Sequence, residues 1–583
     1  MIRAENLSFG YSDRDLYKKI SFTLEDGRHC ALIGSNGTGK TTLADLIRNP
    51  DDYLFTGKLF RENVGRIGYV SQFANRDKAQ TTTVFNYLSE DFLNLQEEIG
   101  AVCAQMETAE DLDALLDSYQ KLLDESESMD ADNYEVNIRR QLQLAELENK
   151  ANLELANLSG GEYKLVQVIR QMLRRPGLLI MDEPDVFLDF ENLNGLRDLI
   201  NAYEGTLLVV THSRYLLGHC FDKIWHLENA DLQEFEGNFL EYNFNLLQKK
   251  IELQQAAAVG AAEVQRANEM VERLRKEASE VVDPLKGRVL KAKVTYLERW
   301  KARKIKEPFV EIRQPDIHLP DVAPAEEEQE PEVLLQVQDY TLSFEEKLLE
   351  QVSFAVHAHE KVAIVGPNGT GKTSMLREIW KNTNPSIQFS ENAKVGFFSQ
   401  LQEETLNENN SIYQEFYDIG FTTPASVENH LAQYCFDADS LSRKIRQLSG
   451  GEKNLLQLAK LSVGQENLLL LDEPSSHLDT YAQMALEKAI SEYQGAVLMV
   501  SHDFYSIANC ADVILFVENG TIRTMSPRAF RKMIYKHHFS REYLDLETRK
   551  KDLETRIARL LQDGNCDEAK LLCEELGAIV VKM

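Results

Sequence analysis

The sequence predicts an α/β fold built from two similar domains in tandem, and three observations support this. A glycine-rich loop that ends in Gly-Lys-Thr occurs twice, each time after a short apolar run that is typical of a buried strand. The pentapeptide LSGGE also occurs twice. Downstream of this pentapeptide the motif spacing is the same in both halves, because 24 residues separate Ser159 from Glu183 and also Ser449 from Glu473. Such registration indicates an internal duplication.

The glycine-rich loops have the pattern of phosphate-binding loops. Glycines let backbone N–H groups point at phosphate oxygens, and the helix that follows adds the partial positive charge of its N-terminus. We expect Lys40 and Lys372 to reach the β- and γ-phosphates, and Thr41 and Thr373 to ligate Mg²⁺. The nucleotide-binding residues expected from the loops are Gly34, Ser35, Asn36, Gly37, Thr38, Gly39, Lys40, Thr41 and Thr42, and Gly366, Pro367, Asn368, Gly369, Thr370, Gly371, Lys372, Thr373 and Ser374.

Paired carboxylates end two further apolar strands, at Asp182-Glu183 and Asp472-Glu473. In each pair we expect the aspartate to support Mg²⁺ and the glutamate to orient or activate the attacking water. A histidine follows a second apolar strand in each half and is expected to sense the γ-phosphate. A glutamine after a further strand suits a ligand to the metal or the water. These residues are His212 and His502, and Gln72 and Gln400.

Two aromatic residues are weaker candidates for stacking on adenine. Tyr11 ends the first apolar segment, and Phe344 lies one position out of register with it in the second half. Either side chain could equally serve in strand packing.

Composition and length limit the class of protein. The 583 residues can hold two or three domains with substantial cores, and no run approaches the ~18–20 apolar residues that span a bilayer. The N-terminal Met1-Ile-Arg has no secretory signal, and the seven cysteines are scattered without the spacing of a metal site, which favours a cytoplasmic protein.

A basic segment lies between the two halves of an acidic chain. The net charge is −30, yet residues 249–306 carry 15 Lys+Arg against 8 Asp+Glu. The pattern of helix formers, broken near Asp283-Pro284 and Gly287, predicts two antiparallel helices. Such a basic limb is suited to nucleic-acid phosphates, with a solvated inter-domain spacer as the alternative. The basic residues proposed for RNA contact are Lys286, Arg288, Lys291 and Lys293.

The two halves differ in length. Lys40 and Ser159 are 119 residues apart, whereas Lys372 and Ser449 are 77 apart. The extra residues predict a helical arm within residues 84–150, whose binding role is left open. The domains expected are residues 1–240, the linker 241–306, an acidic connector 307–332, the second domain 333–535 and a helical tail 536–583, for which packing and binding are both open.

At this point the chain resembles the ATP-binding-cassette (ABC) superfamily, through both phosphate loops, both glutamines, both LSGGE signatures, both Asp-Glu-Pro stretches and both histidines. The resemblance covers residues 1–240 and 333–535. It implies an ATPase that uses ATP and Mg²⁺, in which two cassettes form a head-to-tail sandwich. Each ATP would lie between one phosphate loop and the opposite signature. The signature residues implied are Ser159, Gly160, Gly161 and Glu162, and Ser449, Gly450, Gly451 and Glu452.

Within that superfamily the chain is similar to the ABC-F family. The similarity rests on paired cassettes, a basic two-helix linker, an arm in the first cassette, and the stretches Ser475–Asp479 and Gly237–Tyr242. The fold class it implies is α/β, with two P-loop ABC ATPase domains in tandem, joined by an antiparallel two-helix linker and with a helical arm in the first. It also implies ribosome binding in the ATP-closed state, a linker that reaches the peptidyl-transferase region and the tRNA, and a monomer.

Among ribosomal roles the long linker and the divergent first cassette favour antibiotic protection over a housekeeping translation factor. The first half carries Asp185-Val-Phe-Leu-Asp189 where the second carries Ser475-Ser-His-Leu-Asp479, so two competent sites of unequal rate are expected, with a degenerate first site as the alternative. An ATPase subunit of a separate membrane transporter and a DNA-repair-type ATPase remain as further alternatives.

Overall fold

The structure is a computed structural model, and it describes residues 1–11, 14–62, 64–72, 81–107, 112–186, 188–252, 255, 314–322, 332–344, 347–536, 541–580 and 582. The chain divides into two compact units. One contains residues 1–236 and 313–534, and the other contains residues 237–312 and 535–583. The first unit holds both cassettes. In the part of the chain that the structure describes, no helix combines the length and apolar character needed to cross a membrane.

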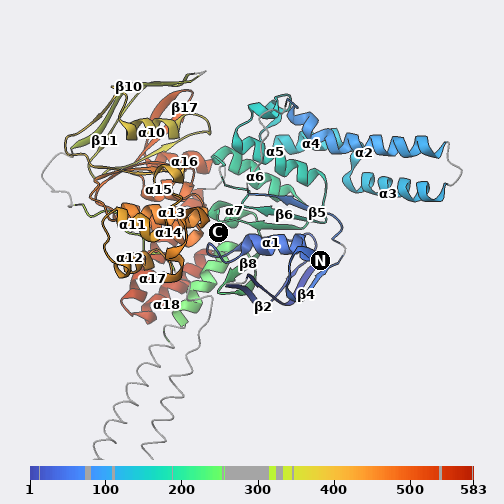
Figure 1. Ribbon diagram of the computed structural model, residues 1–583, viewed down its shortest axis with the longest axis horizontal. Helices are drawn as coiled ribbons and strands as arrows, with labels where there is room; N and C mark the ends of the chain where they lie inside the picture. Colours follow the sequence, from blue (N-terminus) through green and yellow to red (C-terminus); the bar gives the residue numbers. More distant parts are fainter. Residues whose placement is uncertain are drawn as a thin grey trace, which may run out of the picture. The chain divides into compact units, whose positions relative to one another are not determined.

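The first cassette is built on two sheets (Figure 1). Strands β2, β1 and β4 form an antiparallel sheet, and β5-β6-β7-β3-β8-β9 form a six-stranded sheet that is parallel except for β9. The strands are β1 Ile2–Tyr11, β2 Arg14–Leu24, β3 His29–Ile33, β4 Thr56–Arg61, β5 Ile67–Val70, β6 Leu178–Asp182, β7 Leu207–Val210, β8 Lys223–Glu228 and β9 Asp231–Glu236. The helices are α1 Lys40–Arg48, α2 Val84–Met106, α3 Asp113–Met129, α4 Tyr134–Leu144, α5 Gly160–Leu173, α6 Phe190–Ala202 and α7 Arg214–His219.

The second cassette repeats this topology. Its small sheet has the order β11-β10-β13, and its large sheet has the order β14-β15-β16-β12-β17-β18. The strands are β10 Val333–Ser343, β11 Lys347–His357, β12 Lys361–Val365, β13 Ile387–Phe389, β14 Val395–Phe398, β15 Leu468–Asp472, β16 Ala496–Val500, β17 Val513–Glu518 and β18 Thr521–Met525. The helices are α10 Lys372–Lys381, α11 Ile412–Asp418, α12 Pro424–Ala432, α13 Gly450–Leu461, α14 Thr480–Glu492, α15 Phe504–Cys510 and α16 Pro527–Lys536.

The large sheets explain why the motifs converge. Strands β6 and β15 are fully buried, as expected for near-continuous apolar runs in a parallel sheet that is covered on both faces. Strands β3, β5, β6 and β7 lie in one parallel sheet, so their carboxyl ends meet at one edge. The phosphate loop, Gln72, Asp182-Glu183 and His212 follow these four strands. The second cassette places its motifs in the same way.

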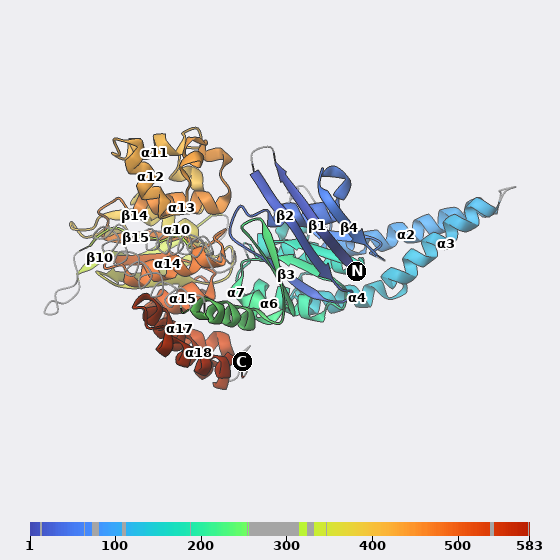
Figure 2. The same cartoon turned by 90° about the horizontal axis from the view of Figure 1, so that it is seen from below.

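The arm of the first cassette is a helical hairpin. Helices α2 and α3 lie side by side and extend away from the large sheet (Figures 1 and 2). At its base, Asp91 of α2 accepts from Arg170 of α5 at 3.0 Å and from Arg174, the residue that directly follows α5, at 2.6 Å. The Arg170 guanidinium also lies 4.3 Å from the ring centroid of Tyr87. The arm is therefore joined by charge to the helix that begins at the first LSGGE.

The second unit has its own apolar core. Helices α17 (Arg541–Gln562) and α18 (Cys566–Val580) lie side by side (Figures 1 and 2). Their buried residues Leu553, Ile557 and Leu576 pack with Ile251 and Phe244 of the helical residues 239–252. Since the sequence left packing and binding open for the tail, this core shows that its helices pack against the start of the linker. The linker beyond these residues lies outside the described part.

Candidate nucleotide sites

The phosphate loops depend on glycines at their entry. Gly34 has φ 150°, and a Cβ there would lie 2.1 Å from the Leu227 carbonyl oxygen. Gly366 has φ 158°, and its Cβ would lie 2.7 Å from the Val517 carbonyl oxygen. No larger residue fits at either position, so the turn that aims the loop amides inward requires glycine.

Each loop lysine folds over its own loop. Lys40 Nζ donates to the carbonyl oxygens of Gly34 and Ser35, both at 2.9 Å. Lys372 Nζ donates to those of Gly366 and Pro367 at 2.8 and 2.7 Å. Burial lowers the pKa of both lysines, while the neighbouring carboxylates oppose this shift. Both ammonium groups are thus held beside the space that the loop amides surround.

The threonine and aspartate expected at the metal meet in both cassettes. Thr41 Oγ1 donates to Asp182 Oδ1 at 3.2 Å, and Thr373 Oγ1 donates to Asp472 Oδ1 at 2.8 Å. The other carboxylate oxygen, Asp472 Oδ2, is buried and has no hydrogen-bond partner within the described residues. A hydroxyl beside a buried carboxylate with a free oxygen is a donor set that fits Mg²⁺, which prefers oxygen ligands.

The two glutamates share an unusual backbone and a raised pKa. Glu183 and Glu473 have φ 45° and 50°, in the left-handed region that non-glycine residues seldom occupy. Burial raises the pKa of Glu183 to about 7 and that of Glu473 to about 8, and the nearby carboxylates of Asp185 and Asp472 add to these shifts. A carboxyl group that titrates near neutrality is suited to general-base catalysis.

The glutamines and histidines lie around these glutamates. Gln72 Nε2 donates to Glu183 Oε2 at 2.5 Å. The backbone N–H of His502 donates to Glu473 Oε2 at 3.2 Å, and its Nε2 lies 3.6 Å from Glu473 Oε1. Burial lowers the pKa of His502 to about 3, so its imidazole is neutral. His212 Nε2 is buried without a hydrogen-bond partner within the described residues, which leaves it free for a ligand oxygen.

Both LSGGE motifs are helix N-caps. Ser159 Oγ accepts from the Glu162 backbone N–H, and the Glu162 side chain accepts from the Ser159 backbone N–H; Ser449 and Glu452 repeat this capping box at α13. The glycines that follow have no side chain, so neighbouring groups can approach the helix N-terminus closely. This arrangement presents a positive helix end to an anion.

The phosphate loop of each cassette contacts the opposite cassette. The Asn36 backbone N–H donates to Asp479 Oδ2 at 3.0 Å, and the Asn368 backbone N–H donates to Asp189 Oδ2 at 2.9 Å. The two LSGGE signatures differ in how closely they approach the opposite phosphate loop. A Cβ on Gly451 would lie 2.1 Å from Asn36 Nδ2, whereas the nearest neighbours of a Cβ on Gly161 belong to its own cassette. The first phosphate loop therefore meets the opposite signature closely.

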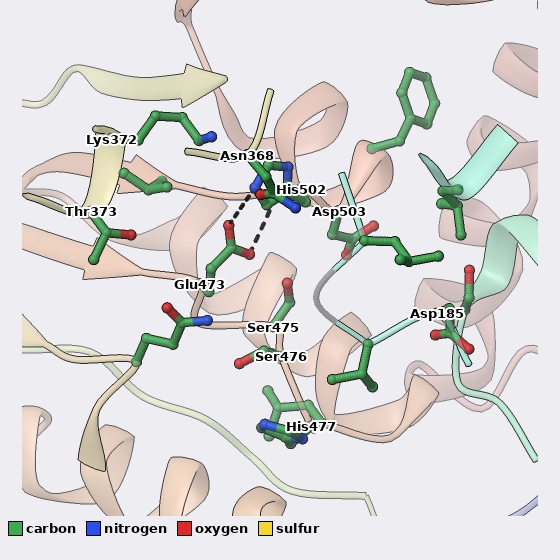
Figure 3. A pocket seen from close by; sticks show the side chains of 18 of the residues that line it. Asp185, Asn368, Lys372, Thr373, Glu473, Ser475, Ser476, His477, His502 and Asp503 are labelled. Atoms are coloured by element: carbon green, nitrogen blue, oxygen red, sulfur yellow. Dashed lines mark hydrogen bonds and ion pairs between the residues drawn. The ribbon is translucent and has the colours of Figure 1, made fainter. Parts of the chain in front are cut away.

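A cavity of about 350 Å³ lies at the second site (Figure 3). The second cassette contributes Lys372, Thr373, Gln400, Glu473 and His502 to its lining. The first cassette contributes residues that include Glu183, Asp185, His212 and Arg214. In Figure 3, Glu473 and His502 are joined by dashed lines, with Lys372 and Thr373 beside them. The cavity brings together the lysine, metal-site, glutamate and histidine positions of one half.

The aromatic candidates are both accessible. Tyr11 is 56% exposed at the end of β1, where its ring contacts Phe9 edge-on at 5.3 Å, and Phe344 is 69% exposed just after β10. Neither ring is buried in strand packing, so both remain candidates for stacking on a base.

Three residues of the first site have no motif that identifies them. Glu228 accepts from the backbone N–H and hydroxyl of Ser35 at 3.0 and 2.8 Å. Tyr17 donates its hydroxyl to the Gly39 carbonyl oxygen at 2.5 Å. Lys164, buried in α5, donates to the carbonyl oxygens of Ser71 and Gln72. Lys164 and Tyr17 differ from the second half, which has Asn454 at the position of Lys164, and that difference could have drawn attention to them in the sequence; Glu228 has an identical counterpart, Glu518, and gave no such signal.

The predicted RNA contacts Lys286, Arg288, Lys291 and Lys293 lie outside the described residues, as do most of the linker and the acidic connector. Their roles stay predictions.

Known proteins resemble this chain along most of its length. The sequence model of the family described as "ABC transporter" matches residues 17–186 and 349–476, just over half of the chain. The chain is 28% identical over 516 residues to the energy-dependent translational throttle protein EttA of Escherichia coli K12, covering 86% of this chain and 89% of that protein. It is 27% identical over 534 residues to ABC transporter F family member 5 of Arabidopsis thaliana, covering 89% of this chain and 75% of that protein.

Among solved structures, the RNase-L inhibitor matches with a TM-score of 0.54 at 17% identity, covering 91% of this chain and 93% of that one. This likeness confirms the predicted fold class of tandem ABC ATPase domains. The resemblance found from the motifs is also confirmed, since relatives along most of the chain are named as F family members. The chain belongs to the ATP-binding-cassette family, as a tandem of two cassettes that bind and hydrolyse ATP.

Proposed function

We propose that this chain is an ABC-F ATPase that binds the ribosome when its cassettes close on ATP and leaves after hydrolysis. The observation that carries the proposal is the reciprocal contact between Asp479 and Asn36 and between Asp189 and Asn368, because it ties each phosphate loop to the other cassette. Nucleotide at either loop would therefore change how the cassettes meet. The translational role comes from the relative named as a translational throttle.

In the proposed sites Mg²⁺ is held by Thr41 and Asp182 and by Thr373 and Asp472, with Gln72 and Gln400 as further ligands. Bound Mg²⁺ would neutralise charge on the β- and γ-phosphates. Glu183 and Glu473 accept the proton of the attacking water, and the neutral imidazoles of His212 and His502 contact the γ-phosphate. The opposite signatures bind the same phosphates through their helix N-termini.

The test of ribosome binding uses Glu183→Gln together with Glu473→Gln. The double variant should still bind ATP but not hydrolyse it, so it should cosediment with 70S ribosomes in the presence of ATP. The matched control adds Lys40→Ala and Lys372→Ala, which remove the phosphate contacts and should release the protein. A double variant that sediments free of ribosomes with ATP present contradicts the proposal.

The basic limb is tested separately. Replacing Lys286, Arg288, Lys291 and Lys293 with Gln should weaken ribosome binding and flatten its salt dependence, by up to about three units in the slope of log K against log salt. Four exposed basic residues elsewhere (Lys58, Lys381, Lys394 and Arg556) serve as the matched control. If the linker substitutions and the control substitutions weaken ribosome binding equally, the basic limb is only a spacer.

A role in antibiotic protection near the peptidyl-transferase region is the finer proposal, with a housekeeping translation factor as the alternative. It is supported by the length of the basic linker and by the divergence of the first cassette at Asp185. A drug-sensitive host that expresses this chain should become resistant to at least one of five antibiotic classes. These are the lincosamides, pleuromutilins, streptogramins A, phenicols and macrolides. The hydrolysis-deficient double variant is the control. Unchanged susceptibility to all five classes favours the housekeeping role.

A further inference from the structure

Arg214 of the first cassette reaches into the second. It lies two residues after His212, at the first position of α7. Its guanidinium donates to Glu487 Oε1, and to Asp503 Oδ2 at 3.2 Å. It also lies 4.5 Å from the ring centroid of Tyr505. Only 13% of the side chain is exposed, so this is a buried ion pair between cassettes.

The acceptors of Arg214 belong to a connected network. The second oxygen of Glu487 accepts from Asn509 Nδ2 at 2.8 Å, and Ser506 donates to Asp503 Oδ2 at 2.7 Å. The other oxygen of Asp503 accepts from the Tyr505 backbone N–H at 3.0 Å and so caps α15. Arg214 therefore supplies a positive charge to carboxylates that already organise the start of α15.

This network adjoins the second nucleotide site. Asp503 follows His502 directly, and the His502 backbone N–H donates to Glu473 (Figure 3). The same cavity is lined by Arg214, Asp503, Glu473 and Lys372. A continuous set of contacts thus runs from Arg214 through Asp503 to His502 and Glu473.

At the equivalent positions of the duplication, the residue types present in the described part do not allow a reciprocal ion pair. The position of Arg214 is occupied in the second cassette by Phe504, whose ring lies 6.4 Å from that of Phe190. The position of Glu487 is occupied in the first cassette by Arg197, which donates to Asp198 and Tyr215 of its own cassette. The link therefore runs from the first cassette to the second site only.

We infer that Arg214 is a positioning residue for the second nucleotide site, supplied by the opposite cassette. It fixes the loop from His502 to Tyr505, and through it the place of Glu473, only while the cassettes are joined. The inference rests on the proposed roles of Glu473 and His502. Hydrolysis at the second site would then depend on the position of the first cassette through Arg214. This dependence would be separate from the contacts that the signatures make with ATP.

The test measures each site alone. In Glu183→Gln only the second site hydrolyses ATP, and in Glu473→Gln only the first does. Arg214→Gln should lower kcat of the second site about 10- to 100-fold with little change in KM, because Lys372 and its loop are untouched. The loss at the first site should be at least tenfold smaller. Arg197→Gln, the matched variant in the first cassette, should not lower the second-site rate.

Two further variants separate positioning from folding. Arg214→Lys keeps one charge but not the two-carboxylate geometry, so it should restore part of kcat. Asp503→Asn combined with Arg214→Gln should lose little more than Arg214→Gln alone, since both act through one contact. If Arg214→Gln does not fold, Arg214→Lys and Asp503→Asn should still lower second-site kcat selectively.

Equal losses at both sites, or additive losses in the double variant, would overturn the inference. The doubly substituted Glu183→Gln/Glu473→Gln protein is measured first. If it still hydrolyses ATP at the parental rate, the glutamate assignment fails, and that result is distinct from failure of the Arg214 link.

Discussion

The two cassettes share one backbone topology but hold their nucleotide loops with different side chains. In the first, Glu228 and Tyr17 bind the phosphate loop, and the buried ammonium of Lys164 binds the loop of Gln72. In the second, the loop after β14 is held by the neutral amide of Gln457, and Asn454 replaces Lys164. Duplication has thus conserved where the reacting groups lie, while several of the contacts that hold them have diverged. Glu518 stands at the position of Glu228, for example, but Pro367 replaces Ser35 and has no N–H to donate to it. These different contacts around the nucleotide loops predict that the two sites hydrolyse ATP at unequal rates.

The largest expected effect is on hydrolysis. Glu183→Gln and Glu473→Gln should each lower hydrolysis at their own site by about 10²- to 10⁴-fold, since each removes the proposed general base. The rate that remains in each single variant is then the rate of the other site, and the two should differ. Phosphate release under steady state measures them. A single variant that keeps the full parental rate would show that its site is degenerate.

The ion pairs of Asp91 at the base of the arm should contribute more to the free energy of unfolding than the ion pair of Glu415 in the second cassette. Asp91→Ala removes the carboxylate that pairs with both poorly exposed arginines and leaves Arg170 only its ion pair with Glu90, so it should lower the free energy of unfolding by about 3–5 kcal/mol. At the equivalent place Glu415 pairs with the single, more exposed Lys460, so Glu415→Ala should cost about 1–3 kcal/mol. Denaturant unfolding measures both. Asp124→Ala, at an exposed arm position, is the control, and equal losses at Asp91 and Glu415 would contradict the comparison.

The rate of ATP hydrolysis at both sites should rise as the pH increases. Burial raises the pKa of Glu473 to about 8 and that of Glu183 to about 7, so each carboxyl group is protonated below that pH and cannot act as a base. The rate should fall on the order of tenfold per pH unit below each pKa, and the second site should decline first as pH falls. The sign for stability is opposite, because a raised carboxyl pKa contributes stability at low pH that is lost as pH rises through it.

These profiles are measured as kcat between about pH 6 and 9.5 in the two single-site variants. His502 does not produce the transition, because burial lowers its pKa to about 3. A flat profile in either variant would remove the corresponding glutamate as the base.

The smallest expected effect is at the first phosphate loop. Tyr17→Phe removes the hydroxyl that donates to Gly39, which is worth about 1 kcal/mol, so the KM for ATP at the first site should rise a few-fold. In the second cassette the nearest neighbours of a Cβ on Gly371 are apolar atoms of Leu342 and Leu348, so among the described residues no equivalent hydroxyl lies there to be lost. Tyr53→Phe, which removes a hydrogen bond to Asp45 away from the loop, is the control.

Site residues could be predicted from the sequence where the groups that act together are near neighbours in the chain. Lys40 and Thr41 begin α1 directly after one short loop, and the Ser159–Glu162 cap spans four residues, so their geometry follows from the sequence. The parallel sheet then brings the strand ends together. Asp182 could therefore be placed beside Thr41 although 141 residues separate them.

The supporting contacts could not be predicted, because Lys164, Arg214 and Glu487 belong to none of the predicted motifs. Lys164 meets Gln72 across 92 residues and Arg214 meets Glu487 across 273, and a lysine or arginine in a helix usually faces solvent. Only tertiary packing decides that these two are buried. The same holds for the tail, whose mixed charges gave no sign that Leu553 and Ile557 would pack on the start of the linker.

The aspartates at the contact between cassettes divide their oxygens between two tasks. Asp189 Oδ1 caps α6 through Asn192 and Asp479 Oδ1 caps α14 through Ala482, while each Oδ2 accepts from the opposite phosphate loop. When the cassettes part, water can replace the partner of Oδ2 and the helix keeps its cap. Opening would therefore exchange a part-buried hydrogen bond at each aspartate for one to water and leave the helix caps in place, so it would not require partial unfolding.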